Sequence, residues 1–120
     1  MAHFSGIFLD KQSRSRLLAN FTVPEGWKPY AEHLTISLGS LPDNLKQKVG
    51  MTYKLKITKI GISKTNIALG VDTKLDTKNK IPHITLAVDV ENGGKPLMSN
   101  QITKWKNIKP FYVTGKLNEK

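Results

Sequence analysis

The sequence predicts an α+β domain whose sheet is mostly antiparallel and whose helices are few. Apolar and polar residues alternate along several segments, most clearly in residues 51–60 (MTYKLKITKI), and this period of two is typical of strands with one solvent-facing side. Longer helix signals follow only Asp10 and Ser99. The predicted order is therefore strand, helix, strand, turn, strands, strand, helix, strand.

The first half of the chain opens with a strand and a helix. Asp10 can cap the helix, and Leu17 and Leu18 give it an apolar side. An irregular, proline-containing stretch leads to the next strand, and Pro42 can start a short helical turn. The predicted segments are a strand over 4–9, a helix over 11–20, a strand over 33–38 and a turn over 42–48.

The second half consists mainly of strands. A Lys-rich segment after Val71 has Leu75 as its one large apolar residue and predicts a mobile loop. Ser99 can cap a helix carrying Ile102 and Trp105, so we expect Trp105 to pack in the core. The predicted segments are strands over 51–60 and 67–71, a loop over 72–80, a strand from His83, a helix after Ser99 and a strand over 111–117.

Length and composition fit one domain, residues 1–120, with a core of its own. The chain has no cysteine, which excludes disulfides and thiolate metal sites. No apolar run reaches membrane-spanning length and no signal-peptide pattern opens the chain, so we expect a cytoplasmic protein with no membrane partner. The net charge of +10 fits either a solvated Lys-rich surface or a polyanionic ligand.

Two tripeptides carry the most information about function: His33-Leu34-Thr35 and His83-Ile84-Thr85. Both lie in runs of apolar and β-branched residues, so His and Thr of each motif should face the same side of a strand. A single His-x-Thr would usually be structural. Here two of the three histidines of the chain occur in matching contexts, and such a pair is hard to obtain by chance.

The paired motifs resemble those of the 2H phosphoesterase superfamily, which is named for two His-x-Thr/Ser motifs. The likeness covers most of the chain, through FSGIFLD, AEHLTISLGSLP, LKITKIGISKTNIALGV and PHITLAV with the following Gly pair. It implies a bilobal fold with a central cleft, in which the motifs face each other from neighbouring strands. Within the superfamily the chain is most similar to the phage anti-CBASS nucleases, which degrade cyclic nucleotide signals.

The residue types suit phosphodiester hydrolysis near neutral pH. His33 and His83 can serve as general acid and base, in an order that the sequence leaves open. Thr35 and Thr85 can donate hydrogen bonds to phosphate oxygens. We expect no cofactor and no metal, because only Glu32 offers a carboxylate beside a motif histidine and should face the opposite side.

Further candidates would bind the rest of a nucleotide. Lys80 and Lys95 flank the second motif and could attract the anion, although both are more typical of a solvated surface. A base could stack on an aromatic face; Phe4 is the leading candidate, because the first strand borders the cleft in the superfamily. The other aromatic candidates are Tyr30, Trp27 and Trp105.

Three functions remain open at this point. The first is a metal-independent phosphodiesterase acting on cyclic or 2′–5′-linked oligonucleotides; the resemblance to anti-CBASS nucleases implies a phage protein that degrades immune signals in the host cytoplasm. The second is an RNA-processing enzyme that opens 2′,3′-cyclic phosphate ends. The third is a non-catalytic nucleotide or RNA binder, although pure binding does not need two titrating imidazoles. Oligomeric state and protein partners are not indicated.

Overall fold

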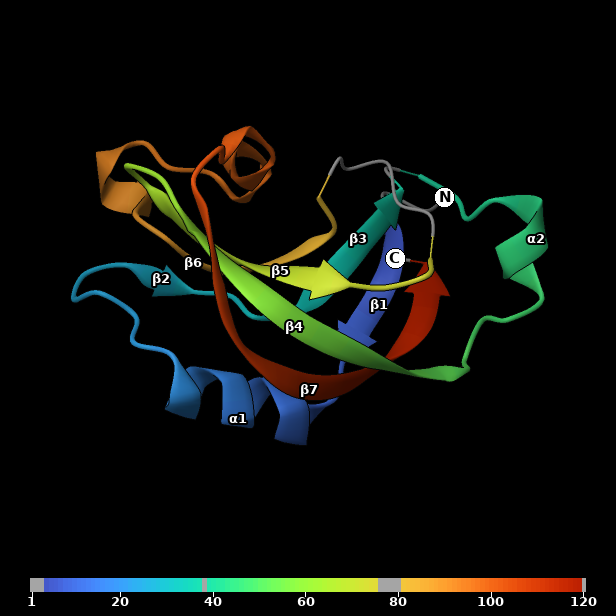
Figure 1. Ribbon diagram of the computed structural model, residues 1–120. Helices are drawn as coiled ribbons and strands as arrows, with labels where there is room; N and C mark the ends of the chain where they lie inside the picture. The colour runs from blue at the N-terminus through green and yellow to red at the C-terminus, as the bar shows by residue number, and fades with distance from the viewer. Residues whose placement is uncertain (1–3, 38, 76–80, 120) are drawn as a thin grey trace.

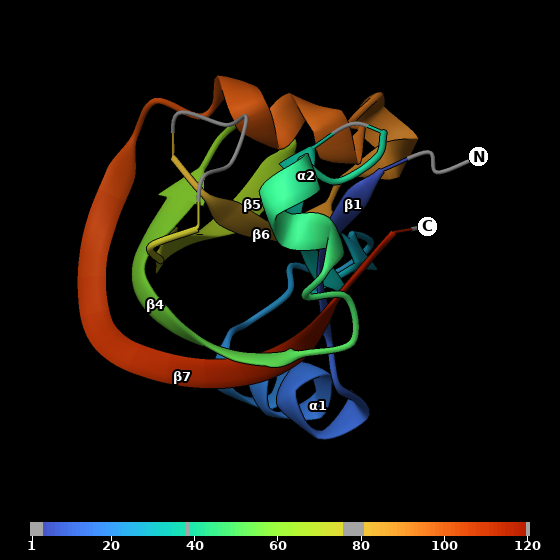
Figure 2. The ribbon, with the colours of Figure 1, turned by 90° about the vertical axis from the view of Figure 1, so that its right-hand side faces the viewer.

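The computed structural model describes residues 4–37, 39–75 and 81–119. They form an antiparallel sheet with strand order β2-β6-β3-β1-β7-β4-β5, and β5 also pairs with β6, so that six strands close into a barrel (Figures 1 and 2). The strands are β1 (Ser5–Leu9), β2 (Lys28–Pro29), β3 (His33–Ser37), β4 (Thr52–Ile62), β5 (Asn66–Asp72), β6 (His83–Val88) and β7 (Trp105–Glu119).

The helices are short and few, as the sequence predicts. They are α1 (Lys11–Asn20), α2 (Asp43–Lys46) and the 3₁₀ segments η1 (Val90–Asn92) and η2 (Pro96–Gln101). Asp10 caps α1 as expected, its carboxylate accepting from the Ser13 backbone N–H at 2.7 Å. The mostly antiparallel sheet with few helices is thus confirmed. The closed barrel is not clearly bilobal, so the expected division into two lobes about a cleft is not apparent.

The core fills the barrel with the inward side chains of alternating strand residues. Fully buried examples are Leu34 and Ile84, which are register partners across β3 and β6. Leu17 of α1 and Leu45 of α2 join this cluster. Helix α1 lies beneath β7 in both ribbon views, and α2 lies in front of the barrel opening in Figure 2. The helices therefore complete the core of a curved sheet.

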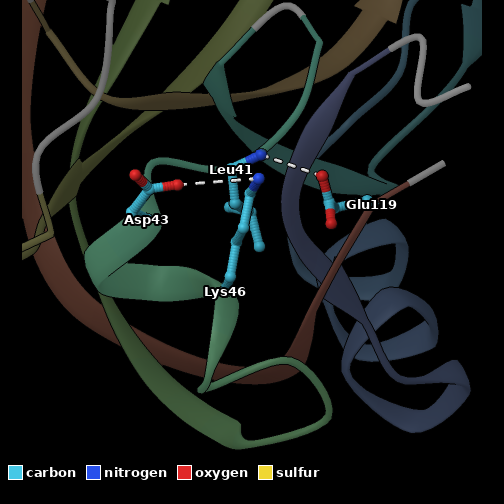
Figure 3. Close-up of polar contacts among 4 residues, drawn as sticks. All are labelled: Leu41, Asp43, Lys46 and Glu119. Carbon is cyan, nitrogen blue, oxygen red and sulfur yellow. Dashed lines mark hydrogen bonds and ion pairs between the residues drawn. The ribbon is translucent and has the colours of Figure 1, made fainter.

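The loop that carries α2 is tied to the last strand. The backbone N–H of Leu41 donates to Glu119 of β7 at 2.9 Å, beside an exposed Lys46–Asp43 ion pair of 3.6 Å (Figure 3). Leu41 itself is 3% exposed. This tie holds the loop over the barrel and depends on the Glu119 carboxylate.

One predicted helix is wrong. Ser99 caps no helix; it lies inside η2, Ile102 follows that segment, and Trp105 begins β7. Strand β7 runs for 15 residues, well beyond the predicted 111–117. It bends where Ile57 to Lys59 of β4 change register, and this irregularity hides the regular alternation on which a strand prediction relies.

Two further expectations concern the loop over 72–80 and the lack of a membrane-spanning segment. Of the loop predicted over 72–80, residues 76–80 lie outside the described residues. Among the described residues, no helix is long and apolar enough to cross a membrane.

Candidate active site on the outer face of strands β3 and β6

The two His-x-Thr motifs lie side by side on β3 and β6. These strands are antiparallel with Leu34 opposite Ile84, which places His33 opposite Thr85 and Thr35 opposite His83. Leu34 and Ile84 are fully buried in the barrel. Because side chains alternate across a sheet, the four motif side chains project from the outer face. Two imidazoles and two hydroxyls thus form one quartet, with the histidines on a diagonal.

Aromatic rings border the quartet on the β1 side. Phe8 is the register partner of His33, and their ring centroids are 5.4 Å apart. Phe4 lies closer, at 4.7 Å from His33 and 5.5 Å from Phe8. The structure therefore brings the predicted residue Phe4 to the first motif and adds Phe8, which the sequence analysis missed. These rings desolvate one side of the His33 imidazole.

His83 is held from two directions. Its Nδ1 lies 2.9 Å from the carbonyl of Ile81, which can only accept, so Nδ1 carries the proton and Nε2 is left to exchange one. The ring of Trp105 stands 6.3 Å away. Trp105 is accommodated because Gly61 and Gly70 face it: a Cβ on Gly61 would lie 2.7 Å from the ring, and one on Gly70 3.4 Å.

Thr85 belongs to a buried polar chain on the other side of the quartet. Its hydroxyl donates to Ser99 Oγ of η2 at 3.0 Å. Asn66 Nδ2 donates to the same Ser99 Oγ at 3.0 Å and to the Lys95 carbonyl at 2.9 Å. Thr65 donates to Asn66 Oδ1 at 2.7 Å. Because Asn66 is 0% and Ser99 1% exposed, this chain fixes η2 against the sheet and fixes Thr85 within it.

Burial favours the neutral form of both imidazoles. Desolvation lowers the pKa of His33, the Glu32 carboxylate raises this pKa, and the charge of His83 lowers it. Desolvation also lowers the pKa of His83, against the hydrogen bond with Ile81. The two rings are therefore close enough to influence each other, and both titrate below the usual value for histidine.

Other predicted residues are not brought to the quartet. Tyr30 is half-buried, with its carbonyl accepting from Arg14 and its ring under Lys28. Lys95 is exposed and contributes its carbonyl to Asn66. Trp27 packs against the core. Lys80 lies outside the described residues.

Asn66 is the polar residue that the sequence analysis missed beside the motifs. It opens the otherwise apolar run NIALGV, and a lone amide at the start of a fully buried strand is the signal that points to it, because such a group needs partners.

The part of the chain that the structure describes contains no group of three His, Asp or Glu side chains placed to hold a metal ion. No protein-family model matches the chain, and no curated protein matches it. The two imidazoles, placed on a diagonal, can transfer protons to and from a bound anion. The two hydroxyls can donate hydrogen bonds to that anion at a partly desolvated surface.

Proposed function

We propose that this protein is a metal-independent phosphodiesterase that cleaves nucleotide phosphodiesters by acid–base catalysis with His33 and His83. One observation carries the proposal: the β3–β6 register sets the two motifs against each other on one face. On a sheet, directly opposed Cβ atoms are about 5 Å apart and diagonal partners about 7–8 Å apart. A phosphate between the histidines therefore has one imidazole toward the attacking oxygen and one toward the leaving oxygen.

In this mechanism His83 is the base and His33 the acid. The fixed Nδ1–H of His83 leaves its Nε2 lone pair available. The nucleophilic hydroxyl loses its proton to Nε2 as its oxygen bonds to phosphorus. His33, where the Glu32 carboxylate offsets part of the burial that disfavours the charged imidazolium, gives its proton to the leaving oxygen as that P–O bond breaks. For a 2′–5′ link the nucleophile is the neighbouring 3′-hydroxyl; for a 2′,3′-cyclic phosphate it is water.

Thr35 and Thr85 stabilise the phosphate oxygens in this proposal. Thr35 stands between Gly6 and His83 in the register of the sheet. Thr85 already donates to Ser99, but a hydroxyl can reverse its role. When a phosphate oxygen binds, Ser99 donates to Thr85 and Thr85 donates to the phosphate. Asn66 stays a donor to Ser99 in both arrangements, so the chain aims a hydrogen bond at the charge that develops.

The leading substrates are cyclic or 2′–5′-linked oligonucleotides, as the resemblance to 2H phosphoesterases and to the phage anti-CBASS nucleases suggests. Under this proposal the protein would act in the cytoplasm of an infected host and remove immune signals. RNA ends carrying a 2′,3′-cyclic phosphate are the second candidate, which the three lysines of β4, Lys54, Lys56 and Lys59, favour.

The test is a substrate panel with EDTA present. It contains cyclic di- and trinucleotides, 2′–5′ oligoadenylate and RNA ending in 2′,3′-cyclic phosphate, with products separated by chromatography. We expect cleavage of at least one member by the unmodified protein and none by His83→Asn. Binding without turnover across the panel would show a non-catalytic binder and overturn the proposal. Loss of activity with chelator and its return with one metal would overturn the two-histidine chemistry.

A further inference from the structure

Two long strands of the barrel are strongly basic. Strands β4 (TYKLKITKIGI) and β7 (WKNIKPFYVTGKLNE) carry six lysines and a single acidic residue, Glu119 at the far end. On β4, Leu55 and Ile57 are buried while Lys54 is exposed and Lys56 half-exposed. The lysines of β4 therefore project from the outer face of the barrel, the same face of the sheet that carries the His-Thr quartet.

The register of the sheet connects this Lys-rich surface to His83. Gly70 of β5 is the partner of His83, and Lys59 of β4 is the partner of Gly70. Gly70 has no side chain of its own, and two side chains close over it: a Cβ there would lie 3.0 Å from the Lys59 Cβ and 3.4 Å from the Trp105 ring. Neighbouring strands are spaced by about 4.8 Å, so Lys59 stands about 10 Å from His83 along the sheet.

A cavity of about 490 Å³ opens on this path. It is lined by Thr58, Lys59, Gly70, Val71, Asp72, Ile81, Pro82 and Asn107. Ile81 and Pro82 immediately precede His83 in the chain. The lining offers an amide at Asn107 and a carboxylate at Asp72, which accepts N–H groups and repels phosphate. The cavity therefore suits a nucleobase better than a phosphate group, with Pro82 and Ile81 as apolar walls.

Beyond the cavity the surface continues with a stacking residue. Lys56 is flanked in the register by Asp72 of β5 and Tyr112 of β7. Tyr112 is 41% exposed, and Lys54 Nζ lies 4.6 Å from its ring centroid. An exposed aromatic ring among lysines on an open strand surface is the combination with which proteins hold single-stranded nucleic acid: bases stack and phosphates pair with ammonium groups.

We propose that the cavity and the surface of Lys54, Lys56, Lys59 and Tyr112 bind a linear single-stranded RNA. The reacting phosphate lies at the quartet, the adjoining base enters the cavity, and the next phosphates follow β4. This inference rests on the proposed function, because ribose hydroxyl chemistry selects RNA. It narrows the substrate from compact cyclic di- and trinucleotides to a linear strand that extends past Lys59.

The first experiment measures binding without turnover. The His83→Ala protein is titrated with a 5′-fluorescein-labelled ten-nucleotide RNA at several salt concentrations. We expect the added Lys54→Gln/Lys56→Gln/Lys59→Gln change to weaken binding at least tenfold at low salt. The slope of log K against log salt should fall by about 2, because each phosphate contact on a single strand contributes roughly 0.7. Tyr112→Leu should weaken binding by about tenfold through loss of stacking.

The matched control removes the same charge elsewhere. Lys11→Gln/Lys46→Gln/Lys48→Gln alters exposed lysines on α1 and around α2 and should change RNA affinity by less than threefold. Equal losses in the two triple variants would show that only net charge matters and would overturn the proposal. Stronger binding to phosphatidylserine vesicles than to RNA, lost in the β4 variant, would assign the surface to a membrane and overturn it too. Circular dichroism checks the fold, and Lys54→Gln/Lys56→Gln serves if changing Lys59 disturbs it.

A second measurement separates this inference from the proposed function. With active protein, kcat/KM is compared for a ten-nucleotide RNA ending in 2′,3′-cyclic phosphate and for a 2′,3′-cyclic mononucleotide. The β4 triple variant should lose at least tenfold on the RNA and less than twofold on the mononucleotide. If the variant changes kcat/KM by the same factor on the RNA and on the mononucleotide, the RNA surface is refuted while the catalytic proposal stays intact. RNA binding without any turnover would refute the catalytic proposal alone.

Discussion

The His83 Nδ1–H group donates to the carbonyl of Ile81, two residues earlier on the same chain, at 2.9 Å. This bond fixes the imidazole against the backbone of Ile81 and leaves Nε2 as the atom that can exchange a proton. The ring of Trp105, seated over Gly70, lies 6.3 Å from the imidazole. The second motif is therefore built so that its histidine has one orientation and one reactive nitrogen.

Replacing either motif histidine should abolish turnover with little change in fold. His33→Ala and His83→Ala each remove a positioned proton carrier, and such a loss costs about 10²–10⁴ in rate. His83→Asn is the informative companion, because its amide can donate to Ile81 without carrying a proton. Steady-state kinetics on the cleaved substrate check this. Either alanine variant retaining more than a tenth of the original rate would mean that the two-histidine mechanism is wrong.

Thr35→Val and Thr85→Val should lower kcat by less than the histidine changes, since each removes one hydrogen bond to the phosphate but no proton carrier. Losing one such donor costs roughly 10²–10³ in rate. Thr85→Ser should restore most of the rate, because the hydroxyl returns. Kinetics with thermal melts separate rate from stability. Unchanged rates in both valine variants would show that neither hydroxyl reaches the phosphate.

Ser99→Ala should affect both stability and rate. The change leaves Asn66 Nδ2 with one partner fewer in a site where Asn66 is 0% exposed, and a buried donor left unpaired costs about 1–3 kcal/mol. It also frees Thr85 to rotate, so kcat should fall more than KM rises. Chemical denaturation and kinetics test the two effects separately. Met98→Ala, in the same 3₁₀ segment, is a suitable control.

The rate should depend on pH as a bell, because one histidine must be neutral and the other charged. Glu32→Gln removes the charge that raises the pKa of His33. With His33 as the acid, the alkaline limb of kcat/KM should move to lower pH while the acidic limb stays in place. A shift of the acidic limb instead would mean that His33 is the base and His83 the acid. A rate that climbs steadily to alkaline pH would exclude paired histidines.

The fold should lose stability below about pH 6.5. Burial lowers the pKa of His33 and of His83 in the folded chain, whereas in the unfolded chain both keep about 6.5. Below about pH 6.5 the unfolded state binds more protons than the folded state. The free energy of unfolding therefore falls as the pH is lowered, until the lowered folded pKa values are reached. Denaturant titrations from pH 7.5 to 5 test this. His33→Asn should flatten the dependence, and an unchanged slope would contradict it.

The sequence predicted the strands around the motifs well, because His33 and His83 sit in apolar runs whose alternation the barrel preserves. It could not show that Leu34 faces Ile84, since register is set by packing of distant strands. Trp105 illustrates the main error: its spacing from Ile102 fits a helix, but the glycines that receive its ring lie on β4 and β5. Phe8 was missed for the same reason, because its importance arises from neighbours far along the chain.

Closure of the barrel also determines when the chain can fold. Strand β7 pairs with β1 on one edge and with β4 on the other, so that Ser5 is the register partner of Glu119. Such pairings join residues at the greatest sequence separation, and they slow folding because the loop entropy must be overcome first. During synthesis on the ribosome, the edges of β1 and β4 that pair with β7 stay without this partner until β7 emerges. The interval before that moment is when this chain is most exposed to aggregation and to chaperones.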